Sequence, residues 1–317
     1  MKRISSIIFA ILLVASCNDD KAPTMRDNSI GLNADIIAQQ ETRSGSLDIH
    51  KGTSTEGMTA GVWFSTTNGK YDTTDPLLIS LPFHSTIEYN GGETPTTPYY
   101  DPDSKKNPLC YPTDNTSVYC VGLYPASGWE WTTTADYTVA RHTVNGKQDI
   151  MFAKQISGTW NNPFPRQQYK HLLMWIDVEM RATDHDAIRN WGKINTITIK
   201  SPSNKVAINL KSGEVDYNAG NAENIVISDT PTELETTIKS IGTSTLCIPQ
   251  KEITLIIESD NFSKEVNVNL VDAGGNLLDN DAGAAGKLFI INLYFNTFNE
   301  IYANSSLIPW NEQEIEL

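Results

Sequence analysis

The sequence predicts an all-β protein with two tandem β-sandwich domains. Apolar residues recur at every second position in several short runs, which is the spacing of a strand with one buried face. Polar loops rich in Pro and Gly separate these runs, for example over residues 89–107 and 272–286, and such punctuation favours sandwiches over one open sheet. Helical periodicity is confined to residues 184–191, where Asp184 or Asp186 is placed to cap a short helix.

The N-terminus predicts export and a lipid anchor. The apolar run Ile7–Ala15 follows a basic start and is too short to cross a bilayer as a permanent helix, which takes about 20 residues. The run leads into Ser16-Cys17, and this junction resembles the bacterial lipobox, in which the cysteine is acylated and becomes the first residue of the mature chain. We therefore predict a signal peptide over residues 1–16, a lipid on Cys17 and a polar tether over residues 17–28.

The residues after the cysteine indicate where the protein is delivered. Asn18-Asp19-Asp20 resemble the surface-export tag of Bacteroidetes lipoproteins, which implies an outer-membrane lipoprotein exposed at the cell surface. The alternative interpretation is an ordinary secretory signal with an incidental cysteine.

Length and charge limit the number of domains and the kinds of partner that this chain can have. Without the signal peptide about 300 residues remain, which is enough for two ordinary domains. We place their boundary in the polar stretch 181–190, so that the N-terminal sandwich covers residues 29–183 and the C-terminal sandwich covers residues 184–317. The net charge of −14 disfavours nucleic acid as a partner, because phosphate binding needs clustered Lys and Arg.

The alternation places the strands in the following order. The first, over residues 29–37, carries Ile30, Leu32, Ala34 and Ile36 on one face. A second alternation runs without interruption through Lys170–Met180. Two strands, Val206–Leu210 and Val215–Tyr217, then flank a turn at residues 211–213, as in a hairpin. Further strands are expected at Ile253–Glu258, Glu265–Val271 and Lys287–Phe295.

Three cysteines remain after Cys17, namely Cys110, Cys120 and Cys247, and their spacing is not that of a metal site. At least one of the three must lack a disulfide partner. A disulfide between Cys110 and Cys120 is compatible with a hairpin connection. The other interpretation is that all three are small apolar residues in strands.

Catalytic and metal-binding motifs are absent from the sequence. The five histidines are scattered, and none has the spacing that places two metal ligands on one helical face. The cluster Asp184-His185-Asp186 is read as a helix cap or a solvated loop, because adjacent side chains point in different directions. We therefore predict a protein that is not an enzyme and uses no cofactor. An acidic pair brought together by the fold, as in a glycosidase, is not excluded by the sequence.

Trp129-Glu130-Trp131 is the strongest candidate for a carbohydrate platform. In a strand the two tryptophans would share one face, and in a loop they would be exposed for stacking on sugars. The competing interpretation, which we favour, is that Trp129 and Trp131 close the end of a sandwich.

Several segments resemble the Bacteroidales fimbrillin-like family, the two-domain subunits of surface fimbriae. The segments that carry the resemblance occur in the same order as in the family: residues 117–125 (SVYCVGLYP), 148–153 (QDIMFA), 169–173 (YKHLL), 286–293 (GKLFIINL) and 308–310 (IPW). His171, in the third segment, is expected to be a hydrogen-bonded structural residue. The resemblance implies two transthyretin-like β-sandwiches, a structural role in a cell-surface fimbrium that supports adhesion, and polymerisation by strand exchange.

The family's assembly implies a role for particular residues of this chain. A precursor would fill its own groove with its first strand, here Ile30, Leu32, Ala34 and Ile36, and proteolysis would release that strand. Arg43 lies in the polar segment that follows and is the predicted cleavage point, whereas cleavage at the competing Arg26 would leave the strand in place. The donor to the next subunit would be the C-terminal tail, which carries Ile315 and Leu317.

Two alternatives stay open from the sequence. Neither arginine is cleaved if this is an anchor subunit that keeps its lipid, and shaft, tip and anchor positions are not distinguished. A protein of a different class, a monomeric surface glycan-binding lipoprotein of a polysaccharide-uptake system, also fits the signal peptide and the aromatic content. The implied partners are other copies or related fimbrial subunits, the outer membrane through the lipid, and a host or bacterial surface receptor.

Overall fold

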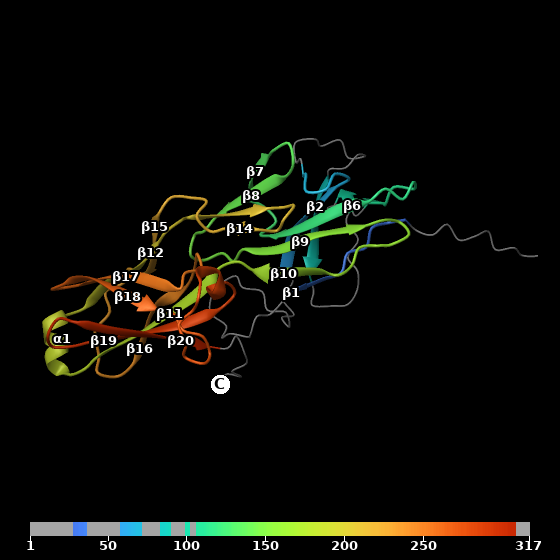
Figure 1. The fold of residues 1–317 in the computed structure, drawn as a ribbon. Coiled ribbons are helices and arrows are strands. Elements are labelled where there is room, and N and C mark those ends of the chain that lie inside the picture. Colours follow the sequence, from blue (N-terminus) through green and yellow to red (C-terminus); the bar gives the residue numbers. More distant parts are fainter. Residues whose placement is uncertain (1–27, 37–57, 72–82, 90–98, 102–105, 309–317) are drawn as a thin grey trace, which may run out of the picture.

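The computed structural model describes residues 28–36, 58–71, 83–89, 99–101 and 106–308, and the chain there is almost entirely β (Figure 1). The helical elements are α1 (His185–Trp191) and the 3-10 turn η1 (Asp281–Ala284). Asp184 caps α1 by accepting the backbone N–H of Ala187 across 2.8 Å, as the sequence predicts. None of the described helices is long and apolar enough to cross a membrane. The all-β prediction is confirmed.

The first lobe contains a six-stranded sheet and a four-stranded sheet. Neighbouring strands in both are antiparallel except β1 and β10, which are parallel. The order in the larger sheet is β1 (Ala34–Ile36), β10 (Gln167–His171), β9 (Met151–Gly158), β6 (Val118–Tyr124), β2 (Met58–Ser65) and β3 (Phe83–Tyr89). The order in the smaller sheet is β14 (Val215–Asp216), β13 (Lys205–Asn209), β8 (Thr138–Thr143) and β7 (Glu130–Thr133). A separate short hairpin joins β4 (Tyr99–Asp101) to β5 (Lys106–Pro108).

The second lobe contains two four-stranded sheets, seen on the left of Figure 1. In one sheet the order is β16 (Lys239–Cys247), β11 (Met174–Ala182), β19 (Leu288–Phe295) and β20 (Ile301–Ile308), with β11 and β19 parallel. In the other the order is β15 (Glu223–Ser228), β12 (Ile194–Ser201), β17 (Glu252–Ser259) and β18 (Ser263–Asn269), all antiparallel. The strands expected from residues 253, 265 and 287 onward are therefore present.

The two lobes are not formed by the two consecutive parts of the chain that the sequence suggests. The strand β11 precedes the expected boundary at residues 183/184 and yet pairs with β19 in the second lobe. The strand β13 follows that boundary and yet pairs with β8 in the first lobe. A single division at residues 183/184 is thus wrong for the sheets, because alternation identifies a strand without identifying the strand that it pairs with.

The run Lys170–Met180, expected as one strand, is divided between two sheets. It forms the end of β10 and most of β11, which lie in different sheets. The break falls at Leu172 and Leu173, two consecutive residues that are both buried where the chain passes between lobes. The sequence hides the break because Leu172 is apolar and in phase with the buried even-numbered residues of β11, whereas β10 buries the odd-numbered residues 167, 169 and 171.

The hairpin expected around residues 211–213 is confirmed by β13 and β14. Gly213 has φ of +75°, in the left-handed region that glycine adopts at little cost. The side-chain oxygen of Asn209 accepts the backbone N–H groups of Lys211 and Ser212, which fixes the turn.

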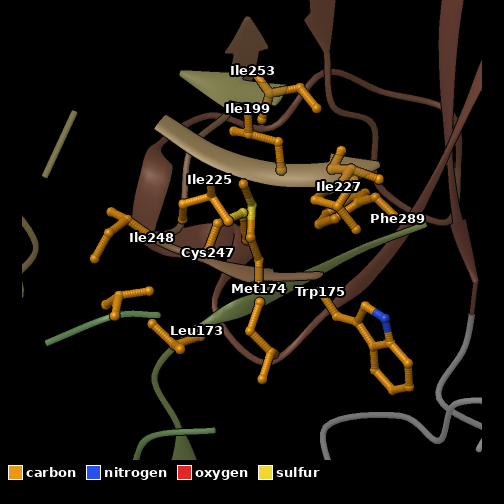
Figure 2. Close-up of a cluster of buried hydrophobic side chains, with 14 of the residues drawn as sticks. Leu173, Met174, Trp175, Ile199, Ile225, Ile227, Cys247, Ile248, Ile253 and Phe289 are labelled. Carbon is orange, nitrogen blue, oxygen red and sulfur yellow. The ribbon is translucent and has the colours of Figure 1, made fainter. Parts of the chain in front are cut away.

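The main hydrophobic core extends through both lobes and consists of residues between facing sheets. Figure 2 shows its second-lobe part, in which Ile199, Ile225, Cys247 and Ile253 lie together. Cys120 and Cys247 are buried among apolar residues, and no disulfide joins Cys110 to Cys120. The disulfide considered from the sequence is therefore absent. The interpretation as small apolar residues in strands is confirmed for Cys120 and Cys247 but not for Cys110, which is half-buried and lies between β5 and β6.

Candidate functional site

Residues 28–36, here called the N-terminal segment, lie against the first lobe and change partner halfway along. The first half runs antiparallel to residues 109–111. The N–H of Ile30 donates to the oxygen of Leu109 across 2.7 Å, and the N–H of Tyr111 donates to the oxygen of Asn28 across 2.9 Å. The first half is therefore held by a loop rather than by the sheet.

The second half of the N-terminal segment is β1, the edge strand of the six-stranded sheet. Ala34 lies opposite Gln167, and the N–H of Gln167 donates to the oxygen of Asn33 across 2.7 Å. Among the described residues, β1 pairs with β10 and with no other strand. Its departure would break one short parallel ladder and leave the rest of the sheet paired, while exposing the edge of β10.

The N-terminal segment also covers a second hydrophobic core. Ile30 and Leu32 are fully buried, and Ala34 is half-buried against the same cluster. In β2, Val62 and Phe64 belong to the second core, whereas Trp63 belongs to the main core. Alternate residues of a strand point to opposite faces, so the second core lies on the face of the six-stranded sheet opposite to the main core. The residues of the second core outside the N-terminal segment are Ala60, Val62, Phe64, Leu109, Tyr111, Val118, Cys120, Tyr124, Met151, Ala153 and Tyr169.

The energy of burying its side chains shows how firmly the N-terminal segment is held. Burying one Ile or Leu side chain contributes about 1.5–3 kcal/mol, so Ile30 and Leu32 together hold the segment by several kcal/mol. Loss of the segment would open an apolar groove beside an unpaired strand edge. Such a surface accepts another extended chain through main-chain hydrogen bonds and alternating side chains.

The polar groups around the second core are suited to packing and not to catalysis. Gln167 is fully buried and donates from Nε2 to the sulfur of Cys120 across 3.7 Å. Burial raises the pKa of the Cys120 thiol well above its ordinary value, which keeps it protonated and unreactive. Burial also raises the pKa of Tyr111 to about 12, and its hydroxyl accepts the N–H of Phe164 across 2.8 Å. No group of three or more metal-ligating side chains occurs in the described part of the chain.

Some of the residues predicted to act in assembly lie in the described part of the chain and others lie outside it. Ile30, Leu32 and Ala34 come together in the N-terminal segment, and Ile36 is the last residue of β1. Cys17, Arg26, Arg43, Ile315 and Leu317 lie outside the described residues.

The other residues singled out in the sequence have structural roles. His171 is buried, and its Nδ1 lies 2.5 Å from Oδ2 of Asp149, as expected for a hydrogen-bonded structural histidine. Trp129 is buried and donates from Nε1 to the oxygen of Pro125 across 2.7 Å. Trp131 is half-buried, with its ring centroid 5.0 Å from that of Trp63. Trp129 therefore belongs to the main core and Trp131 packs against it, so the two do not form an open platform.

Sequence reasoning missed the loop that holds the first half of the N-terminal segment. Leu109 and Tyr111 lie two residues apart between Pro108 and Pro112, and both are buried in the second core. Their alternation was a usable signal, but three residues are too few to be recognised as a strand.

Comparisons with known proteins agree with this geometry. A family model described as fimbrillin-like matches residues 42–310. A candidate cell adhesion protein from Bacteroides uniformis is 15% identical, with a TM-score of 0.50 over 89% of this chain and 98% of that chain. A candidate adhesin from Bacteroides thetaiotaomicron is 8% identical, with a TM-score of 0.51 over 89% of this chain and 98% of that chain.

A structure described as candidate polysaccharide binding proteins, also from Bacteroides thetaiotaomicron, is 8% identical, with a TM-score of 0.51 over 91% of this chain and 99% of that chain. At these identities the structures show a shared fold. No curated protein matches this chain.

Proposed function

This chain belongs to the fimbrillin-like family, and from that premise we propose that it is a structural subunit of a cell-surface fimbrium that supports adhesion and catalyses no reaction. It is exported as an outer-membrane lipoprotein through Cys17. Cleavage after Arg43 then releases the N-terminal segment, and a strand from another subunit takes its place. The two lobes are the transthyretin-like sandwiches that the resemblance implies.

The observation that carries the proposal is the position of the N-terminal segment. It lies at a sheet edge, where β10 is its only strand partner among the described residues, and it fills the second core with Ile30 and Leu32. A segment in the middle of the sheet would have two ladders to break. The family match begins at residue 42, so the N-terminal segment lies outside the region that the family shares and Arg43 lies at its border.

The C-terminal tail has two apolar residues at the spacing of the two sites that Ile30 and Leu32 would leave. Ile30-Gly31-Leu32 places two large apolar side chains two residues apart, and Ile315-Glu316-Leu317 repeats that spacing. Residues two apart on an extended chain share a face. The tail of one subunit is therefore proposed to place Ile315 and Leu317 where Ile30 and Leu32 leave the next subunit.

Treatment of the purified full chain with an Arg-specific protease tests the proposal. We expect a new N-terminus at Ser44 and a ladder of multimers that resists mild denaturation. Arg43→Ala should abolish both results, and Arg26→Ala is the matched control that should leave both unchanged. Monomers after complete cleavage at Arg43, or a ladder from the Arg43→Ala protein, would overturn the proposal.

A second pair of variants tests the donor. Ile315→Asp with Leu317→Asp should leave cleavage intact and stop the ladder, because a charged side chain cannot enter an apolar groove cheaply. Ile238→Asp is the control, since Ile238 is 54% exposed in the folded protein. A ladder that survives the tail variants would assign the donor strand to another part of the chain.

The alternative of a monomeric glycan-binding lipoprotein has less support as the main function. Its strongest sequence feature was Trp129-Glu130-Trp131, and Trp129 is buried against Pro125 and His142. Quenching of tryptophan fluorescence by sugars, with monomers alone after protease treatment, is the result that would favour it.

A further inference from the structure

A cavity of about 620 Å³ lies where the two lobes meet. The first lobe lines it with residues 144–147 and Asn204, and the second lobe lines it with residues from β15, β16 and the loop that follows β15. Ligand pockets in proteins usually measure about 300–1,000 Å³. The cavity is separate from the second core and from the N-terminal segment, because it shares no lining residue with either.

The lining shows that the cavity runs along a strand edge. Every residue from 223 to 230 lines it. Successive side chains of a strand point to opposite faces, so a space that meets all of them must follow the backbone edge. The strand β15 is the edge of its sheet, and β16, which supplies Gly242, Thr243 and Thr245, is the edge of the other sheet in the same lobe.

The outer edge of β15 has no ladder partner. Among the residues that the structure describes, β15 forms a ladder with β12 and with no other strand. Donors and acceptors alternate along such an edge. A ligand seated there must offer both.

The side chains add further unused polar groups. Within the described part of the chain, Lys147, Asn224, Ser228, Asp229 and Thr243 line the cavity and have no side-chain hydrogen bond or ion pair. Amide and hydroxyl groups outnumber charged ones. The single cation, Lys147, is outweighed by the carboxylates of Glu223 and Asp229 that also line the cavity, which disfavours an anionic ligand.

The cavity also offers apolar surface next to these polar groups. Val226 is 54% exposed and lines the same space as Asn224 and Ser228. A sugar ring has hydroxyl groups that both donate and accept and C–H faces that are apolar, so it matches both parts of the lining. We propose that this cavity binds a neutral saccharide.

Two contacts favour a compact ligand over an added peptide strand. The N–H of Leu246 on β16 donates to the oxygen of Gly146 across 2.8 Å, so the first lobe already occupies that part of the edge. Gly242 lies so close to β15 that a Cβ on it would be 2.2 Å from the oxygen of Ile227. The two edges thus approach each other, and a long extended chain would have to displace these contacts.

The test is binding of the full, uncleaved chain to an array of neutral glycans that covers hexose, deoxyhexose and N-acetylhexosamine residues. We expect binding of at least one class, weakened about tenfold or more by Asn224→Ala and by Thr243→Val, which removes a hydroxyl and keeps the shape. Thr236→Val is the matched control, because Thr236 is exposed and does not line the cavity. Lys147→Ala, in a surface loop, serves as a second cavity variant that cannot fail by unfolding the core.

Three results would overturn the proposal. These are no binding to any neutral glycan, binding that none of the cavity variants weakens, and protection of the amides of residues 224–228 from hydrogen exchange by a peptide of alternating Thr and Val but by no saccharide. The last result would assign the edge to an extended polypeptide. Because the test uses uncleaved protein and scores no multimers, its outcome is independent of strand exchange.

Discussion

The backbone N–H of Ile30 donates to the carbonyl oxygen of Leu109 across 2.7 Å, and both side chains are fully buried in the second core. One residue thus joins the N-terminal segment to the first lobe through a main-chain hydrogen bond and through packing. The side-chain part can be removed without touching the main-chain part, which makes Ile30 the natural position at which to measure how firmly the segment is held.

Replacing Ile30 with Ala should lower the free energy of unfolding of the uncleaved protein by about 2–5 kcal/mol, because a large buried side chain is lost and a cavity remains. Val226→Ala is the control, with an expected change below about 0.5 kcal/mol because Val226 is 54% exposed. Urea denaturation measures both. An Ile30→Ala protein as stable as the wild type would mean that the segment contributes no packing energy.

The buried pair of His171 and Asp149 should be sensitive to loss of its carboxylate. Asp149 accepts from the backbone N–H of Ile150 across 2.8 Å in addition to its contact with His171. Asp149→Ala leaves two buried groups without this partner and should cost about 1–3 kcal/mol for each hydrogen bond lost. Thermal unfolding of the single variants and of the double variant with His171→Phe gives their coupling, and additive effects would contradict a direct interaction.

Acid should destabilise the first lobe through His142. Its ring lies 4.9 Å from that of Trp129, and burial lowers its pKa below the ordinary 6.5. A histidine whose folded pKa is depressed stabilises the fold above its unfolded pKa. That stability is lost as the pH falls below 6.5 toward the folded value, because the unfolded chain then binds the proton more readily.

Urea midpoints measured across this pH range should therefore fall more steeply for the wild type than for His142→Gln. Trp129 is the local reporter of the change. Parallel curves for the two proteins would show that His142 does not titrate as described.

Alkali should loosen the second core through Tyr111. Burial raises its pKa from 10 to about 12, so the folded state keeps the phenol proton that the unfolded chain releases first. The associated stability is complete below pH 10 and is lost as the pH rises toward about 12. Tyr111→Phe should flatten this alkaline loss, measured by denaturation at increasing pH, at a cost of about 1 kcal/mol for the hydrogen bond from Phe164. An unchanged alkaline slope in Tyr111→Phe would place the titrating group elsewhere.

Much of the local structure was determined by the sequence alone. Alternation in Ile30, Leu32 and Ala34 identified the segment that covers the second core. Asp184 marked the start of α1, and residues 211–213 marked the turn between β13 and β14. These signals depend on a few neighbouring residues, because caps, turns and one-sided burial are set by local backbone geometry.

Only the tertiary structure decided which strands pair. Alternation predicts that β11 and β13 each bury one face, but it does not say which strand lies beside them. It could not show that β13 pairs with β8 in the first lobe. The second core and the cavity beside β15 could not be predicted from the sequence for the same reason. Each is formed by residues far apart in the chain. Strands pair through main-chain hydrogen bonds, so the side chains of one strand say little about which strand it pairs with.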